Sequence, residues 1–125
     1  MSKTILLIDD DADFRLMLKK LLETNRYRVF DAKNGTEGMS IMQTEEIQLV
    51  VTDIIMPDMD GIETIMKIRS DYPGTPMIAI SGGGRIGPAD YLNAAHTLGA
   101  SRVMAKPFTN EDFLEQVQEA LAESS

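Results

Sequence analysis

The chain has 125 residues, of which 43% are apolar, no cysteine, and a formal net charge of −8 at pH 7. This length and apolar content predict one folded domain over residues 1–125, and the lack of cysteine excludes disulfides and thiolate chemistry. The negative charge disfavours direct nucleic-acid binding, because most of such a surface repels a polyanion.

The first half of the chain alternates between strand and helix patterns. A strand at Thr4–Ile8 precedes a helix over about Ala12–Thr24, for which Asp11 is a suitable N-cap. A strand at Tyr27–Ala32 precedes a helix over about Thr36–Gln43. The expected buried stripe of the first helix is Phe14, Met17, Leu18, Leu21 and Leu22. Gly38 interrupts the second helix at a cost of about 1 kcal/mol relative to Ala, so we expect this helix to be short or mobile.

The second half continues the alternation three more times. The strands expected here are Leu49–Thr52, Met77–Ile80 and Arg102–Ala105. A loop over Met56–Gly61 leads to a helix that ends at Asp71, and its helical period follows Ile62, Ile65, Met66 and Arg69. A fourth helix is expected near Ala89–Leu98. The last opens at Thr109, with Asp112 as a capping-box acid and an apolar face of Phe113, Leu114, Val117 and Leu121.

Short strands rich in Val and Ile, separated by helices, predict an α/β fold with a doubly wound parallel sheet of order 2-1-3-4-5 and five helices. All strands of such a sheet end at the same edge, where open α/β sheets bind ligands. Five polar residues follow or end the predicted strands and should converge there: Asp9, Asp10, Asp53, Ser81 and Lys106.

These residue types are suited to phosphoryl transfer. Clustered carboxylates repel one another unless a hard cation such as Mg²⁺ binds them. Asp53 stands opposite the acidic pair and is the best candidate nucleophile. Lys106 can hold a phosphoryl oxygen through its positive charge, and Ser81 can donate a hydrogen bond to another.

With these motifs in order, the chain resembles a response-regulator receiver domain, which has a flavodoxin-like fold, from end to end. The matching segments are Ile8-Asp9-Asp10, Asp53 with Met56-Pro57 and Asp60-Gly61, Ser81-Gly82, Leu98-Gly99-Ala100 and Lys106-Pro107-Phe108. The resemblance implies a phosphorylation-activated signalling switch, not an enzyme acting on a separate substrate. It identifies Asp53 as the phosphoacceptor, and a histidine kinase or histidine phosphotransferase as the phosphodonor.

The resemblance also implies a ligand set and two sensing residues. Asp10, Asp53 and the backbone carbonyl of Ile55 would ligate Mg²⁺, and Asp9 would act through water. Ser81 and Lys106 would sense the phosphate, and the Lys106-Pro107 peptide bond would be cis.

Two features depart from the family pattern. Val103 stands where family members usually carry an aromatic residue that swings inward on activation. Ser81 and Lys106 are about three residues further apart than is usual, which we interpret as a longer loop that orders when phosphate arrives.

Two other classes of function remain open. A phosphatase resembling the haloacid-dehalogenase group would use Asp9, with Asp11 at the matching spacing, instead of Asp53. A flavodoxin-like nucleotide binder would need amides and hydroxyls after the first strand, where this chain carries aspartates that repel phosphate.

The expected location is a reducing cytoplasm, because no segment resembles a signal peptide and no apolar stretch approaches the ~18 residues of a membrane helix. The output would be a separate protein or a further domain that this sequence does not contain.

Overall fold

The computed structural model describes residues 3–54, 61–81 and 102–123. A five-stranded parallel sheet has the order β2-β1-β3-β4-β5, as the sequence predicted. The strands are β1 (Thr4–Ile8), β2 (Arg28–Ala32), β3 (Leu49–Asp53), β4 (Met77–Ser81) and β5 (Arg102–Ala105). The described helices are α1 (Ala12–Thr24), α2 (Gly35–Thr44), α3 (Gly61–Asp71) and α5 (Asn110–Glu123). The helix expected near Ala89–Leu98 lies outside the described residues.

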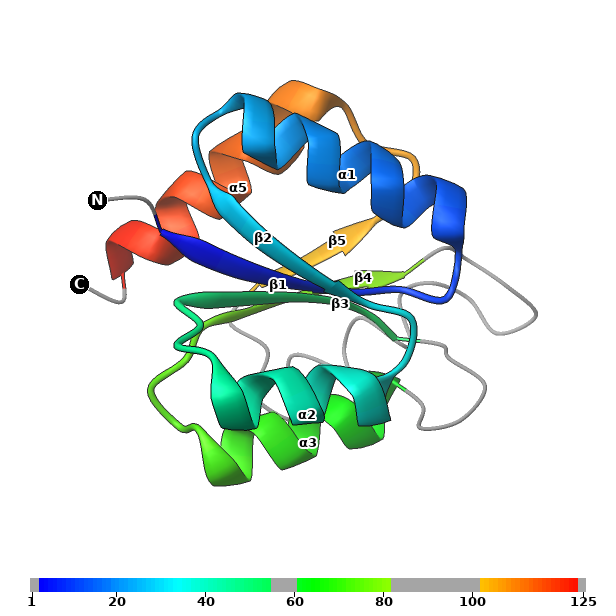
Figure 1. Cartoon of the computed structure of the whole chain (residues 1–125). Coiled ribbons are helices and arrows are strands. Elements are labelled where there is room, and N and C mark those ends of the chain that lie inside the picture. Colours follow the sequence, from blue (N-terminus) through cyan, green and yellow to red (C-terminus); the bar gives the residue numbers. More distant parts are fainter. Residues whose placement is uncertain (1–2, 55–60, 82–101, 124–125) are drawn as a thin grey trace.

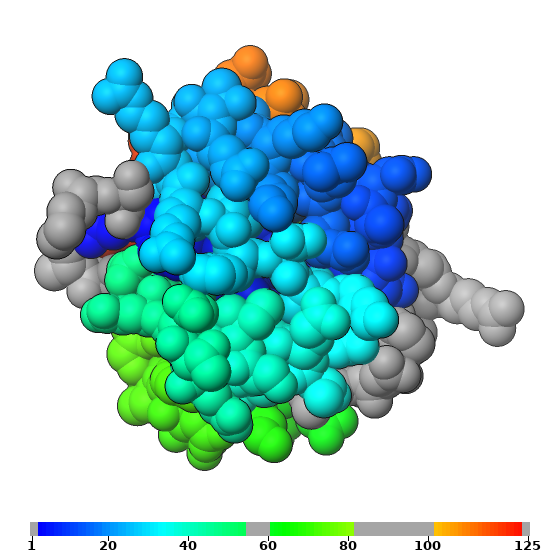
Figure 2. Space-filling view, viewed as in Figure 1, coloured from blue at the N-terminus to red at the C-terminus, as the bar shows by residue number. Residues whose placement is uncertain are grey.

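The helices form a layer on each face of the sheet. Figure 1 shows α1 and α5 on one face and α2 and α3 on the other. In Figure 2, residues of α1, β2 and α2 form a continuous surface over the β2 edge. This arrangement buries both faces of the central strands, which is why those strands are almost entirely apolar.

Alternate side chains of β1 enter two separate cores. Ile5 and Leu7 join the cluster beneath α1 and α5, whereas Leu6 and Ile8 join the cluster beneath α2 and α3. The two-residue period of a strand therefore supplies both layers from one apolar run.

Polar side chains fix the starts of three helices. Asp11 accepts hydrogen bonds from the backbone N–H groups of Asp13 and Phe14, which confirms it as the N-cap of α1. Asn34 accepts one from Glu37 at the start of α2, and the Thr109 hydroxyl accepts one from Asp112 before α5. These bonds satisfy backbone donors that the first helical turn leaves free.

One predicted core residue, Met17, is wrong, and Met66 on the helical period of α3 is exposed as well. Met17 on α1 is 46% exposed, because Leu18 and Leu22 face the sheet and Met17 lies about 100° around the helix from Leu18. Met66 on α3 is 51% exposed. The buried residues of α3 are Gly61, Thr64, Ile65 and Ile68, and Ile65 is the one that also lies on the helical period read from the sequence.

Gly38 has a packing role that its helix propensity did not reveal. A Cβ atom at this position would lie 2.9 Å from Ile8 Cγ1, so the glycine allows α2 to approach β1 closely. None of the helices in the described parts of the chain has the length and apolarity needed to cross a membrane.

Candidate functional site

The carboxyl ends of four neighbouring strands bring the predicted site residues together. Ile8 pairs with Thr52, so Asp9 and Asp53 follow at adjacent strand ends. Asp53 in turn pairs with Ile80, which directly precedes Ser81, and Ser81 pairs with Ala105, which directly precedes Lys106. Parallel register therefore joins residues that are far apart in the sequence.

Three carboxylates form the centre of the site. Asp9, Asp10 and Asp53 each place a carboxylate oxygen within 4.8 Å of the other two. Asp9 is buried, Asp53 is half-buried and Asp10 is exposed. Three oxygen donors converging from two strand ends fit a hard divalent cation that keeps part of its water shell. The predicted fourth ligand, the Ile55 carbonyl, lies outside the described residues.

Asp9 is the buried member of this cluster. Burial raises the pKa of its carboxyl group, and the negative charges of Asp10 and Asp11 act in the same direction. A hydrogen bond from the Asp11 backbone N–H and the positive charge of Lys106 oppose that rise. The rise is due first to burial, which withdraws the Asp9 carboxylate from the water that would stabilise its charge, and a bound cation would supply such stabilisation.

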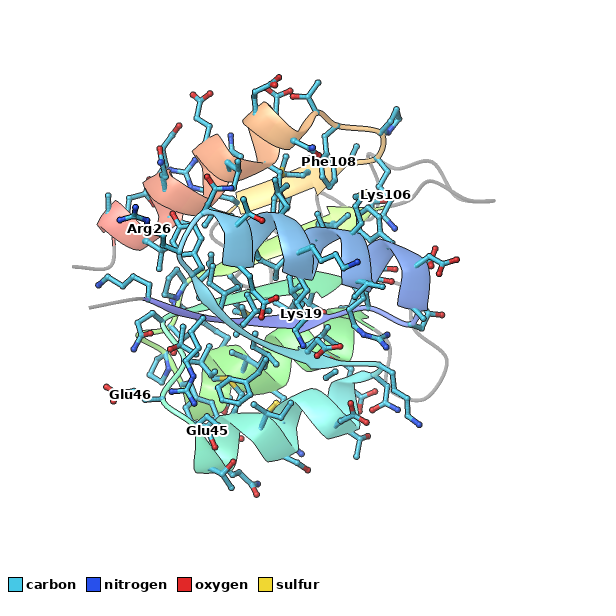
Figure 3. All side chains as sticks on the ribbon, turned by 45° about the horizontal axis from the view of Figure 1, so that its top comes forward. Lys19, Arg26, Glu45, Glu46, Lys106 and Phe108 are labelled. Carbon is cyan, nitrogen blue, oxygen red and sulfur yellow. The ribbon has the colours of Figure 1, made fainter. Side chains whose placement is uncertain are left out.

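Lys106 approaches the acidic cluster from β5. Its Nζ lies 3.8 Å from Asp9 Oδ2, and its backbone N–H donates a 2.8 Å hydrogen bond to the Ser81 carbonyl. The Lys106-Pro107 peptide bond is cis, which confirms that prediction. Figure 3 shows Lys106 and Phe108 on the same side of the molecule as α1.

Ser81 lies at the expected strand end but is fully buried. Val103, at the position where family members usually carry an aromatic residue, is partly buried and packs against the core beneath α2 and α3. The segment after Ser81, including Gly82-Gly83-Gly84, lies outside the described residues.

Arg15 also belongs to this edge of the sheet, although no sequence motif singled it out. Its Nη1 donates a 2.6 Å hydrogen bond to the Asp9 carbonyl, and its Nε forms a 2.9 Å ion pair with Asp31 at the end of β2. Lys19 also pairs with Asp31, at 3.2 Å. Burial opposes ionisation of Asp31, but the bonds from Arg15 and Lys19 outweigh it and lower the pKa of this carboxyl group. The sequence signal for these contacts was the spacing of Arg15 and Lys19, two basic residues four positions apart and therefore on one face of the first helix.

Arg15 also lines a small pocket with Asp9 and Asp53, whose other walls are apolar side chains of β1, β3, β4 and α1. Apolar walls limit water around the two carboxylates, so nearby charges act on them more strongly than they would in bulk solvent.

Comparisons with known proteins place the chain in one family. Residues 5–118 match the profile of the response regulator receiver domain. The response regulator receiver protein CpdR of Brucella abortus is 33% identical over 95% of this chain and 97% of its own length. Sporulation initiation phosphotransferase F of Bacillus subtilis is 29% identical over 97% of this chain and 95% of its own length.

Other curated relatives are longer. The chain spans 27% of the transcriptional regulatory protein GlrR of Escherichia coli, to which it is 31% identical over 97% of its own residues. A crystal structure of a CheY-like receiver domain protein from Methanospirillum hungatei superposes with a TM-score of 0.91 at 31% identity, and the match covers 99% of this chain and 97% of that one.

Proposed function

The chain belongs to the response-regulator receiver family, whose members are phosphorylation-dependent switches in two-component signalling, and we propose that Asp53 is its phosphoacceptor. The observation that carries this proposal is the convergence of three carboxylates, with Lys106 Nζ at 3.8 Å from Asp9. Residues 1–125 would act as one receiver domain.

The proposed reaction is a transfer from a phosphohistidine to Asp53. A carboxylate oxygen of Asp53 attacks phosphorus, an O–P bond forms as the N–P bond breaks, and the imidazole leaves with the bonding electron pair. Asp9, Asp10, Asp53 and the Ile55 carbonyl would hold Mg²⁺, with Asp9 acting through water. When bound, Mg²⁺ supplies positive charge that neutralises phosphoryl oxygens.

Lys106 and Ser81 would recognise the product. The Lys106 ammonium is close enough to the acidic cluster to contact a phosphoryl oxygen after a small movement. The burial of Ser81 means that its hydroxyl must be uncovered before it can donate to phosphate. This rearrangement would be the switching step, and moving from mostly off to mostly on requires about 5 kcal/mol of differential stabilisation.

The partners follow from this reaction. The phosphodonor would be a histidine kinase or a histidine phosphotransferase, and the phosphorylated form would control an output protein or an attached output domain. The chain would act in the cytoplasm and would not bind nucleic acid directly. Catalysis would be limited to its own phosphorylation and a slow autodephosphorylation.

Mass spectrometry of the intact protein tests the phosphoacceptor. After incubation with Mg²⁺ and acetyl phosphate, we expect one hydroxylamine-labile phosphoryl group, absent without metal and absent in Asp53→Asn. Asp31→Asn is the matched control, because it removes a carboxylate at a strand end outside the acidic cluster, and it should still be phosphorylated. Phosphorylation of Asp53→Asn at the wild-type stoichiometry would exclude Asp53. If Asp9→Asn abolished labelling while Asp53→Asn was still labelled, the phosphatase-like alternative would be favoured.

A further inference from the structure

The ammonium group of Lys106 contacts an aromatic ring that the proposed chemistry does not use. Lys106 Nζ lies 3.8 Å from the centroid of the Phe14 ring and also 3.8 Å from Asp9 Oδ2. The Lys106 side chain is 25% exposed, so protein atoms, the ring and the carboxylate among them, cover most of it. A cation over the face of a phenyl ring is attracted by the electron density of that face.

Phe14 is held in place through both its backbone and the edge of its ring. Its backbone N–H donates to the Asp11 carboxylate in the first turn of α1. The ring meets Phe108 edge-on, with centroids 6.0 Å apart and an interplanar angle of 69°. Phe108 stacks at 5.7 Å on Phe113, which is fully buried in α5. A ring supported by a helix cap and a buried aromatic stack is a well-fixed surface for a flexible lysine.

The two partners of Lys106 respond differently to a bound cation. A metal ion among the carboxylates competes with Lys106 for the charge of Asp9, whereas a phenyl ring neither titrates nor ligates Mg²⁺. We propose that Phe14 is a positioning residue that keeps the Lys106 ammonium beside the acidic cluster, ready for a phosphoryl oxygen. The inference rests on the proposed function only for the identity of that oxygen. Leucine at position 14 would supply apolar contact without an electron-rich face.

Nuclear magnetic resonance tests the contact without reference to phosphorylation. In the wild-type protein, the ring current of Phe14 should shift the Lys106 ε-methylene signals upfield. Phe14→Leu should lose this shift, and Phe14→Tyr should keep it. Phe30→Leu is the matched control, because Phe30 also lies beneath a cation, Arg28 at 5.0 Å, but on β2 and in the other core. It should leave the Lys106 signals unchanged.

Binding of beryllofluoride, a phosphoryl mimic, in the presence of Mg²⁺ tests the positioning role. We expect Phe14→Leu to lower the affinity roughly two- to fivefold, with Phe14→Tyr and Phe30→Leu close to wild type. Affinity for Mg²⁺ alone should be unchanged or higher in Phe14→Leu, because a displaced Lys106 no longer competes with the metal for the charge of Asp9, whereas general damage to the site would reduce it.

The two parts of the test separate the two proposals. An upfield Lys106 shift that persists in Phe14→Leu, or equal or tighter beryllofluoride binding by that variant, would overturn the role of Phe14. A wild-type protein that fails to bind beryllofluoride would contradict the proposed function, and the Lys106 signals would still decide whether the ring holds the ammonium.

Discussion

Arg15 connects the ends of two strands, and its replacement by methionine should destabilise the fold. Methionine keeps a long apolar stem but has no hydrogen-bond donor. The change leaves the Asp9 carbonyl without its 2.6 Å donor and Asp31 without its 2.9 Å partner. Because β1 and β2 are neighbours in the sheet, this loss falls at the rim that holds the acidic cluster.

The expected loss in the free energy of unfolding follows from the two contacts that Arg15 makes. Hydrogen bonds that involve a charged group contribute about 1.5–3 kcal/mol when buried. Arg15 is 18% exposed but Asp31 is 32% exposed, so solvent screens the second contact substantially. We expect a combined loss of about 2 kcal/mol in the free energy of unfolding at pH 7. For a domain of this size, that lowers the Tm by about 6–10 °C.

The pH dependence of this stability loss distinguishes the contact with Asp31 from the contact with the Asp9 carbonyl. A lowered pKa means that ionised Asp31 stabilises the fold above its ordinary value of 3.8, and that this stabilisation is lost as pH falls through the lowered value. The difference between wild type and Arg15→Met should therefore narrow in acid. The part that belongs to the Asp9 carbonyl should remain, because a carbonyl does not titrate in this range.

Denaturant unfolding across pH measures both effects, and Lys19→Met is the control. Lys19 also pairs with Asp31, but at 3.2 Å and with both side chains 32% exposed, so its loss should be at most about 0.5 kcal/mol. Equal destabilisation by the two variants, or none in Arg15→Met, would refute the assignment of a bridging role to Arg15.

Three further predictions concern the start of α3 and the acidic cluster. Gly61→Ala should destabilise the protein by about 1–3 kcal/mol, because an added Cβ would overlap the Asp53 carbonyl oxygen and the Ile54 backbone; Gly74→Ala, where nothing lies within 4 Å, should change little. Asp9→Asn should raise the Tm at pH 7 without divalent cations, since a raised pKa means that ionising Asp9 destabilises the folded state. Mg²⁺ at 100-fold its Kd should stabilise the wild type by about 2.7 kcal/mol, and Asp9→Asn less at the same concentration.

Calorimetry checks all of these variants. Equal effects of alanine at positions 61 and 74 would contradict the close approach of α3 to the end of β3. A lower Tm in metal-free Asp9→Asn would contradict the electrostatic account of that carboxyl group.

Local patterns were sufficient to predict the strands and most helix boundaries. The runs Thr4–Ile8 and Arg102–Ala105 and the helix Ala12–Thr24 have the bounds that the sequence indicated. Apolar period and capping chemistry act within a few residues, so the sequence displays them directly. Because parallel strands end at one edge of the sheet, the convergence of the site residues could also be predicted.

The orientation of side chains around each helix was less predictable. Met17 and Met66 are apolar and fall near a helical stripe, yet both are exposed. Whether a flanking residue is covered depends on how the helix is rotated against the sheet, and close packing across the whole layer sets that rotation.

Local period and parallel topology were enough to predict the strand order, the converging acids and the lysine at their rim. The contacts of Arg15 with Asp31 and the Asp9 carbonyl, and of Phe14 with Lys106, became apparent only in the folded chain. Both are side-chain contacts between different elements, and their formation depends on helix rotation and rotamer packing that no segment encodes alone.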